Sequence, residues 1–97
     1  MISDDVGVVA IGRNEGERLI GCLASVKSNT DNIVYVDSGS TDGSIARARQ
    51  TGVYVVTLDS TKPFSAARAR NEGFAALKIL KPDIRFVQFI DSDCILV

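Results

Sequence analysis

Two carboxylates separated by a single residue, Asp91 and Asp93, stand near the end of the 97-residue chain. They follow an apolar run, residues 86–90, which only Gln88 interrupts, and such a run is typical of a strand buried on both faces. Close carboxylate oxygens are the hard ligands that Mg²⁺ and Mn²⁺ prefer, and both ions share the phosphates of a substrate. The D-x-D pattern therefore indicates a metal site at the mouth of a strand, although the same pattern also occurs in solvated turns.

Three further apolar runs end in polar side chains, as the last one does. They are residues 6–11 before Arg13, Asn14 and Glu15, residues 33–36 before Asp37, and residues 53–58 before Asp59. Segments with helical spacing of apolar residues separate these runs, so strand and helix alternate with short connections. This order predicts an α/β fold: an open, mainly parallel sheet of about four strands with helices on both faces.

Local signals mark the ends of the three helices. Asn14, with Glu17 three residues later, predicts the capped start of a helix of about three turns. The second helix is expected over residues 45–50. Ser65 is expected to cap a long third helix, which the sequence Lys81-Pro82-Asp83 ends.

The place of a ligand in such a sheet follows from its topology. Ligands bind beyond the carboxyl ends of the strands, at the point where the strand order reverses. If the fourth strand returns beside the first, Asp37 and Asp91 flank that crevice from two sides. We therefore expect the functional site at this edge of the sheet.

Composition and charge exclude several classes of function. The chain contains no histidine, which excludes Ser-His and Cys-His catalytic pairs and argues against a zinc site. A formal net charge of -1 with scattered arginines predicts no nucleic-acid partner. Cys22 and Cys94 suggest no disulfide, and neither a signal peptide nor an apolar segment of about 20 residues is present, so we expect a cytoplasmic protein.

Four segments, in this order, resemble the family 2 glycosyltransferases. They are VAIGRNE at 9–15, VDSGSTDGS at 36–44, ARNEG at 69–73 and DSD at 91–93. The resemblance covers the chain from Val6 onward. It implies the Rossmann-like GT-A fold and the transfer of a sugar from a nucleotide-diphospho-sugar, linked to UDP or GDP, to an acceptor that the sequence does not define.

The resemblance also implies roles for individual residues. It assigns the nucleotide-sugar donor to Ile11, Arg13, Asn14, Glu15, Asp37, Arg70 and Asp91, and a Mg²⁺ or Mn²⁺ ion to Asp91 and Asp93. Asp37 would accept a hydrogen bond from the base or ribose, and Arg70 would reach the base or the phosphates. The metal would bridge the pyrophosphate and stabilise the charge that builds on the leaving nucleoside diphosphate.

Simpler structural roles stay open for several of these residues. Asp37 would cap the helix that follows it, and Glu15 would favour the N-terminus of its own helix. Arg68 and Arg70 would belong to a solvated helix face. For Asp42, a role in holding its loop and the next helix start is the expected one.

In this family the chain continues into an acceptor site and a catalytic base, and no residue here matches that base by motif. We therefore expect residues 1–97 to form the N-terminal, nucleotide-binding half of a GT-A domain that is inactive by itself. The full-length protein would be compatible with a peripheral place at the inner face of a membrane. The fourth strand would leave one edge exposed, which predicts self-association.

Two other classes share parts of the pattern. A sugar nucleotidylyltransferase has a related sheet, but it normally shows a glycine-rich basic loop directly after the first strand, which residues 12–15 do not supply. A metal-dependent module of the von Willebrand A type carries a D-x-S-x-S site, which residues 37–41 resemble, although Gly39 stands where a hydroxyl ligand is required. Binding of UDP would distinguish the two enzyme classes from the adhesion module.

Overall fold

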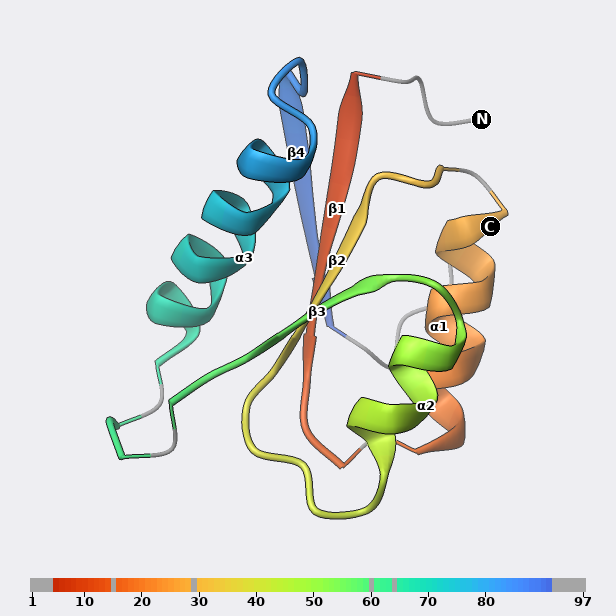
Figure 1. Ribbon diagram of the computed structural model, residues 1–97, viewed down its shortest axis with the longest axis vertical. Helices are drawn as coiled ribbons and strands as arrows, with labels where there is room; N and C mark the ends of the chain where they lie inside the picture. Colours follow the sequence, from red (N-terminus) through yellow and green to blue (C-terminus); the bar gives the residue numbers. More distant parts are fainter. Residues whose placement is uncertain (1–4, 15, 29, 60, 64, 92–97) are drawn as a thin grey trace.

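The computed structural model describes residues 5–14, 16–28, 30–59, 61–63 and 65–91 (Figure 1). Strands and helices alternate along this part of the chain, as the sequence predicts. The elements are β1 (Val6–Gly12), α1 (Glu17–Lys27), β2 (Ile33–Asp37), α2 (Ser44–Gln50), β3 (Tyr54–Thr57), α3 (Ala66–Leu80) and β4 (Phe86–Asp91). The expected α/β fold class is confirmed.

The sheet is parallel throughout, with the strand order β3-β2-β1-β4. The chain runs outward from β1 to β3 and then returns, so that β4 pairs with the free side of β1. The register aligns Gly12 of β1 with Asp37 of β2, and Ile11 of β1 with Asp91 of β4. The carboxyl ends of these strands therefore meet at one edge, and the order reverses between β1 and β4, as expected.

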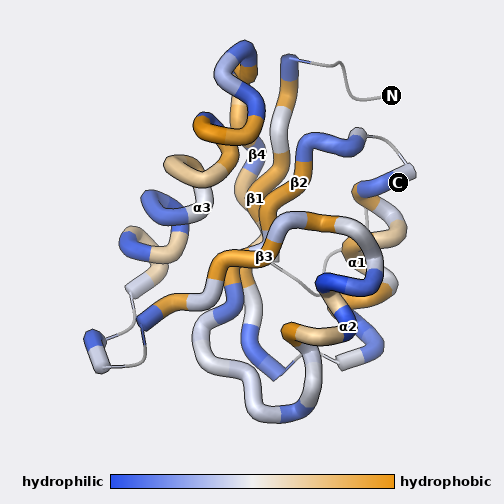
Figure 2. Tube along the Cα trace, viewed as in Figure 1, coloured by the Kyte–Doolittle hydropathy of each residue, from blue (hydrophilic) through white to orange (hydrophobic). Residues whose placement is uncertain are grey.

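Helices cover both faces of the sheet, with α3 on one side and α1 and α2 on the other (Figure 1). Each face has its own apolar core. Leu19, Leu23 and Val26 of α1 pack against Tyr35 of β2 and its neighbours, whereas Leu77 of α3 packs on the opposite face. Figure 2 shows the apolar residues along β1 and β2 and the more polar loops at the lower end of the sheet. Burial on both faces explains why β1 and β2 are near-continuous apolar runs.

A glycine lets α3 lie very close to the sheet. A Cβ atom at Gly73 would stand 2.4 Å from Val9 Cγ1 and 2.8 Å from Val36 Cγ2, well inside van der Waals contact. Gly73 stands in the family-like segment 69–73, and its packing role is visible only in three dimensions. The approach matters for function because the first turn of α3 contributes to the pocket described below.

The prediction that Asn14 caps the first helix is wrong. Helix α1 begins at Glu17, its N-cap position is Gly16, and no side chain caps it. Asn14 instead has a positive φ of 52°, and its side-chain oxygen accepts a hydrogen bond from the Thr41 backbone N–H at 2.7 Å. A donor from a distant loop has replaced the local one, and Asn tolerates the left-handed conformation that this requires.

The other local signals agree with the structure. The Ser65 hydroxyl accepts a hydrogen bond from the Arg68 backbone N–H at 3.0 Å and caps α3, as predicted. Helix α2 begins one residue earlier than expected, and β3 is shorter than the apolar run 53–58 that predicted it. Within the part of the chain that the structure describes, every helix is too short or too polar to cross a bilayer.

Candidate functional site

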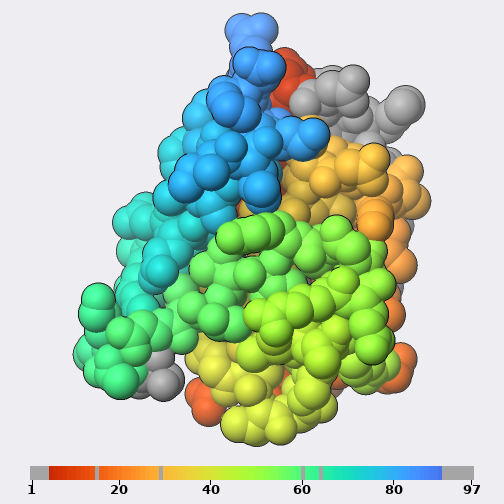
Figure 3. All heavy atoms as spheres, viewed as in Figure 1, coloured from red at the N-terminus to blue at the C-terminus, as the bar shows by residue number. Residues whose placement is uncertain are grey.

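A pocket of about 250 Å³ lies at the carboxyl ends of β1, β2 and β3. Its lining residues come from the three loops that follow these strands and from the first turn of α3. They are Arg13, Ser38, Gly39, Leu58, Asp59, Lys62 and Arg68. In Figure 3 the surface is notched here, between the green segment before α3 and the yellow-green loop after β2. This is the edge at which the sequence predicts a site.

A larger hollow of about 600 Å³ lies beside residues 30–32 and 80–84, at the opposite end of the sheet. These residues precede β2 and β4, so the hollow stands at the amino ends of the strands. Open parallel sheets bind their ligands at the carboxyl ends. The smaller pocket is therefore the candidate site, although the other one has more volume.

The pocket carries a net positive charge. Three of its side chains are basic, namely Arg13, Lys62 and Arg68, and one is acidic, Asp59. The Asp59 carboxylate is engaged by its own loop, because Oδ1 accepts hydrogen bonds from the Thr61 backbone N–H at 2.9 Å and from the Thr61 hydroxyl at 2.7 Å. The hydroxyl bond, followed by the backbone bond, lowers the pKa of Asp59. An excess of fixed positive charge in a concave site favours an anionic ligand.

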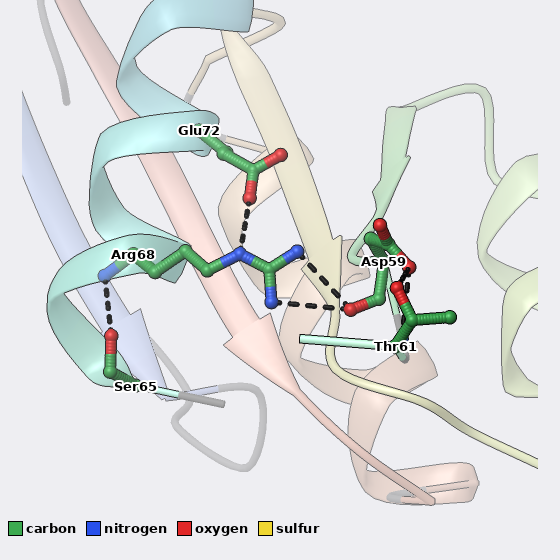
Figure 4. A network of polar contacts seen from close by, with 5 residues as sticks. All are labelled: Asp59, Thr61, Ser65, Arg68 and Glu72. Atoms are coloured by element: carbon green, nitrogen blue, oxygen red, sulfur yellow. Dashed lines mark hydrogen bonds and ion pairs between the residues drawn. The ribbon is translucent and has the colours of Figure 1, made fainter. Parts of the chain in front are cut away.

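Arg68 joins the wall of the pocket to the end of β3 (Figure 4). Its Nε donates to Glu72 Oε2 at 3.0 Å, one helical turn further along α3. Both of its terminal nitrogens donate to the Asp59 carbonyl oxygen at 3.2 Å. The planar guanidinium can hold both partners at once, which a lysine cannot do. Arg68 therefore fixes the β3–α3 loop, and the interpretation of this residue as part of a solvated face is wrong.

Asp37 is the most buried charged residue described, with 1% of its surface exposed. Oδ1 accepts hydrogen bonds from the Tyr35 hydroxyl at 2.7 Å and from the Ser40 hydroxyl. Oδ2 accepts from the backbone N–H groups of Gly39 at 3.0 Å and Ser40 at 2.7 Å. The expected alternative, in which Asp37 caps the following helix, does not occur, because α2 begins only at Ser44. Asp37 holds its own loop.

The loops after β1 and β2 are joined by several hydrogen bonds. The Asn14 backbone N–H donates to the Ser40 hydroxyl at 2.8 Å, and the Thr41 N–H donates to the Asn14 side chain at 2.7 Å. The Ser38 backbone N–H and hydroxyl both donate to the Gly12 carbonyl oxygen, at 3.0 and 3.2 Å. The two loops that form one side of the pocket are thus a single hydrogen-bonded unit.

The start of α2 is organised by Asp42, as the sequence predicts. Its Oδ1 accepts hydrogen bonds from the Ser44 backbone N–H at 3.0 Å and from the Ser44 hydroxyl. The hydroxyl bond is the main reason that the pKa of Asp42 is lowered. The same hydroxyl accepts from the Gly16 N–H at 3.2 Å, which adds another connection to the β1–α1 loop.

The structure brings together only some of the residues that the sequence singled out. Arg13 lines the pocket, Asn14 supports it, Ile11 lies half-buried at the end of β1, and Asp91 ends β4 opposite Ile11. Arg70 is exposed on α3 and does not line the pocket. Glu15 and Asp93 lie outside the described residues.

Four residues that line the pocket are absent from those that the sequence assigned to the donor or the metal: Ser38, Gly39, Lys62 and Arg68. A signal existed for each of them. All four lie within a few residues of the carboxyl end of a strand or at the start of the next helix, where a parallel sheet of this type binds its ligands.

The metal site stays a prediction. Among the residues that the structure describes, no three His, Cys, Asp or Glu side chains gather as metal ligands. The position of Asp91 does fit the expectation, since the strand ends beside Ile11 at the same edge of the sheet as the pocket.

The doubly wound parallel sheet and the polar pocket at its carboxyl edge define a Rossmann-like α/β protein. Within that class the sequence is decisive: the model of the glycosyl transferase family 2 matches residues 8–96, and the chain belongs to this family. The resemblance found in the four sequence segments is confirmed.

Among the proteins that match the chain, two from Rickettsia species are named as glycosyltransferases. A TPR repeat-containing protein of Synechococcus elongatus is 41% identical over 71 residues, which are 73% of this chain and 17% of that protein. An uncharacterized glycosyltransferase of Rickettsia conorii is 36% identical over 55 residues, 57% of this chain and 20% of the relative. An uncharacterized glycosyltransferase of Rickettsia felis is 36% identical over 53 residues, which are 55% of this chain and 19% of the relative. The chain spans about a fifth of the length of these relatives. No solved structure gives a significant match.

Proposed function

We propose that the chain supplies the nucleotide-sugar donor site of a glycosyltransferase that transfers the sugar to an acceptor. The observation that carries the proposal is the basic pocket at the carboxyl edge of the sheet in a chain of glycosyl transferase family 2. A nucleoside diphosphate is the anionic part of such a donor. Its two phosphates match the excess of positive charge in the pocket.

In this proposal, Arg13 and Lys62 attract the diphosphate, while Arg68 holds the loop between β3 and α3 in place. The backbone at Ile11 and the loop residues Ser38 and Gly39 form the wall against which the nucleoside rests. Arg70 stands further along α3 and would reach the donor from outside the pocket.

We also propose that Asp91 and Asp93 hold a Mg²⁺ or Mn²⁺ ion beside the pocket. Asp91 ends β4 next to β1, and Asp93 follows two residues later in the sequence; two carboxylates at this spacing suit the hard ligands and the partial hydration that these ions require. When bound, the ion would stabilise the negative charge of the departing nucleoside diphosphate. The chain's own contribution is to bind and orient the donor.

The family match argues against the adhesion module considered above. The burial of Asp37 argues the same way, because both of its oxygens are occupied by protein donors. The sugar nucleotidylyltransferase stays an alternative only in the sense that it too would bind a nucleotide at this edge. The donor nucleotide, UDP or GDP, and the cytoplasmic setting stay predictions.

Calorimetric titration with UDP and GDP, with and without Mn²⁺, tests the proposal. We expect the chain to bind nucleotide, and we expect Mn²⁺ to strengthen this binding. Asp93→Ala should make the affinity independent of Mn²⁺, and Arg13→Ala should lower it. Arg49→Ala is the matched control, since Arg49 is exposed on α2 and does not line the pocket. If the folded wild-type chain binds neither nucleotide, the proposal is wrong.

We propose in addition that the open edge of β4 pairs with β4 of a second copy. Among the described residues β4 pairs only with β1, and Phe86 and Phe89 are 59% and 40% exposed. An antiparallel pairing centred on Gln88 would set the basic residue 85 of each copy opposite the acidic residue 91 of the other, which favours this register. Edge strands of this apolar character associate readily.

A further inference from the structure

We propose that Asp37 is a positioning residue, which holds the pocket wall in shape from behind and makes no contact with the nucleotide. The inference rests on the proposed donor-site function. It departs from the role that the family resemblance implies for Asp37, in which its carboxylate accepts a hydrogen bond from the base or ribose of the donor.

Protein donors fill all the hydrogen-bond acceptor positions of the Asp37 carboxylate. An ionised carboxylate offers about four acceptor positions, two on each oxygen. Protein donors occupy two on each: the hydroxyls of Tyr35 and Ser40 on Oδ1, and the N–H groups of Gly39 and Ser40 on Oδ2. With 1% of the residue exposed, a ligand would have to displace one of these donors, which would leave a buried polar group unpaired.

The hydrogen bonds of Asp37 also support the loops that carry two pocket-lining residues. The Ser40 hydroxyl, which donates to Asp37, also accepts from the Asn14 N–H at 2.8 Å, and the Asn14 side chain in turn accepts from Thr41. The pocket-lining residues Arg13 and Gly39 flank this chain of bonds. Gly39 has a φ of 119°, and Arg13 Nε lies 3.9 Å from the place of a Cβ on Gly39. The network therefore sets the distance between the loop that carries Arg13 and the loop that carries Gly39.

The hydrogen-bond network is anchored in the apolar core by Tyr35. Tyr35 is fully buried on β2, two residues before Asp37 and on the same face of the strand. Burial, and then the hydrogen bond to Asp37, raises the pKa of Tyr35 above its ordinary value. The hydroxyl thus keeps its proton at neutral pH and donates to the carboxylate. Tyr35 does not line the pocket itself, but it fixes the Asp37 carboxylate, which supports the pocket wall.

Two substitutions separate a positioning role from direct contact. Tyr35→Phe removes one donor from Asp37 and leaves every pocket-lining side chain in place. If Asp37 positions the loop, Tyr35→Phe and Ser40→Ala each weaken the binding of UDP and of GDP by about tenfold and by the same factor for both. Ser40→Thr, which keeps the hydroxyl, binds like the wild type. Tyr54→Phe, the same chemical change at an exposed site on β3, is the control.

Direct contact predicts the opposite pattern. If Asp37 binds the base or ribose, Tyr35→Phe leaves the affinity for both nucleotides unchanged and Asp37→Asn lowers it, with a change in the ratio of UDP to GDP affinity where the contact is to the base; this result would overturn the inference. Amide hydrogen exchange at Gly39 and Ser40 gives a readout without ligand, and we expect Tyr35→Phe to accelerate it at least tenfold at temperatures where the fold is intact. If the wild type binds no nucleotide, the proposed function fails, and the exchange rates still decide whether Asp37 orders the loop.

Discussion

Replacing Gly73 by alanine tests whether α3 really lies against the sheet as closely as described. The new methyl group would lie 2.4 Å from Val9 Cγ1 and 2.8 Å from Val36 Cγ2, whereas carbon atoms pack at about 3.5 to 4.0 Å. Valine side chains on a strand are stiff at χ1, so neither can turn away without cost. The helix must therefore move outward by about 1 Å, and its first turn carries Arg68 with it.

The magnitude follows from two opposing effects. Overpacking a well-filled core costs about 1 to 3 kcal/mol, and two simultaneous overlaps place this site at the upper end. Replacing glycine by alanine inside a helix returns about 1 kcal/mol. We expect Gly73→Ala to lower the free energy of unfolding by about 2 kcal/mol, which corresponds to a fall in Tm of about 10 °C for a domain of this size.

Urea denaturation, followed by circular dichroism, measures this loss, and the nucleotide titration measures the displacement of Arg68. Gly21→Ala is the matched control, because Gly21 is exposed in the interior of α1 and nothing lies within 4 Å of the place of its Cβ. We expect that variant to gain about 0.5 to 1 kcal/mol. Equal stabilities of the two variants would refute the close approach of α3.

Three further outcomes are expected. Arg68→Ala should cost about 1 kcal/mol of stability and weaken nucleotide binding, because it removes the hydrogen bonds to Glu72 and to the Asp59 carbonyl. Arg68→Lys should restore little of the stability or of the affinity, and full recovery by lysine would contradict the role of the guanidinium group. Since hydrogen bonds from Ser44 hold the pKa of Asp42 below 3.8, their stabilisation is complete above that value and is lost as the pH falls through the lower, folded-state pKa. The stability difference between wild type and Ser44→Ala, from urea titrations at several pH values, should therefore shrink below about pH 4. Light scattering should show a dimer that Phe89→Pro dissociates, because the backbone N–H of residue 89 faces the open edge of β4, and a clean monomer across the micromolar range would rule out pairing through β4.

The sequence sufficed to predict the alternation of elements because β1 and β2 are near-continuous apolar runs buried on both faces, and because apolar residues recur at helical spacing between the strands. The cap at Ser65 was predictable as well, because its partner is three residues away and a local rule finds it. Asn14 illustrates the limit. Its partners, Ser40 and Thr41, lie on another loop, and no local rule shows that they will take the place of a cap.

The candidate site was predictable in its place but not in its detail. That a carboxylate ends β2 is visible in the sequence, but whether its oxygens face a ligand or the protein depends on what surrounds Asp37 in three dimensions. One signal was available, since Tyr35 stands two residues earlier and so shares a strand face with Asp37. For Arg68 and Arg70, the motif favoured the second, whereas the spacing of Arg68 from Glu72 favoured an ion pair along the helix.

The position of β4 also constrains the order in which the protein can fold. Strands β1, β2 and β3 pair with near neighbours in sequence, but Val6 of β1 finds its other partner, Phe86, only near the far end of the chain. Pairings of such long range close slowly, because most of the chain must be ordered before they form. During synthesis β1 is thus exposed on one side until β4 emerges, and a chaperone or a neighbouring nascent chain would meet that side first.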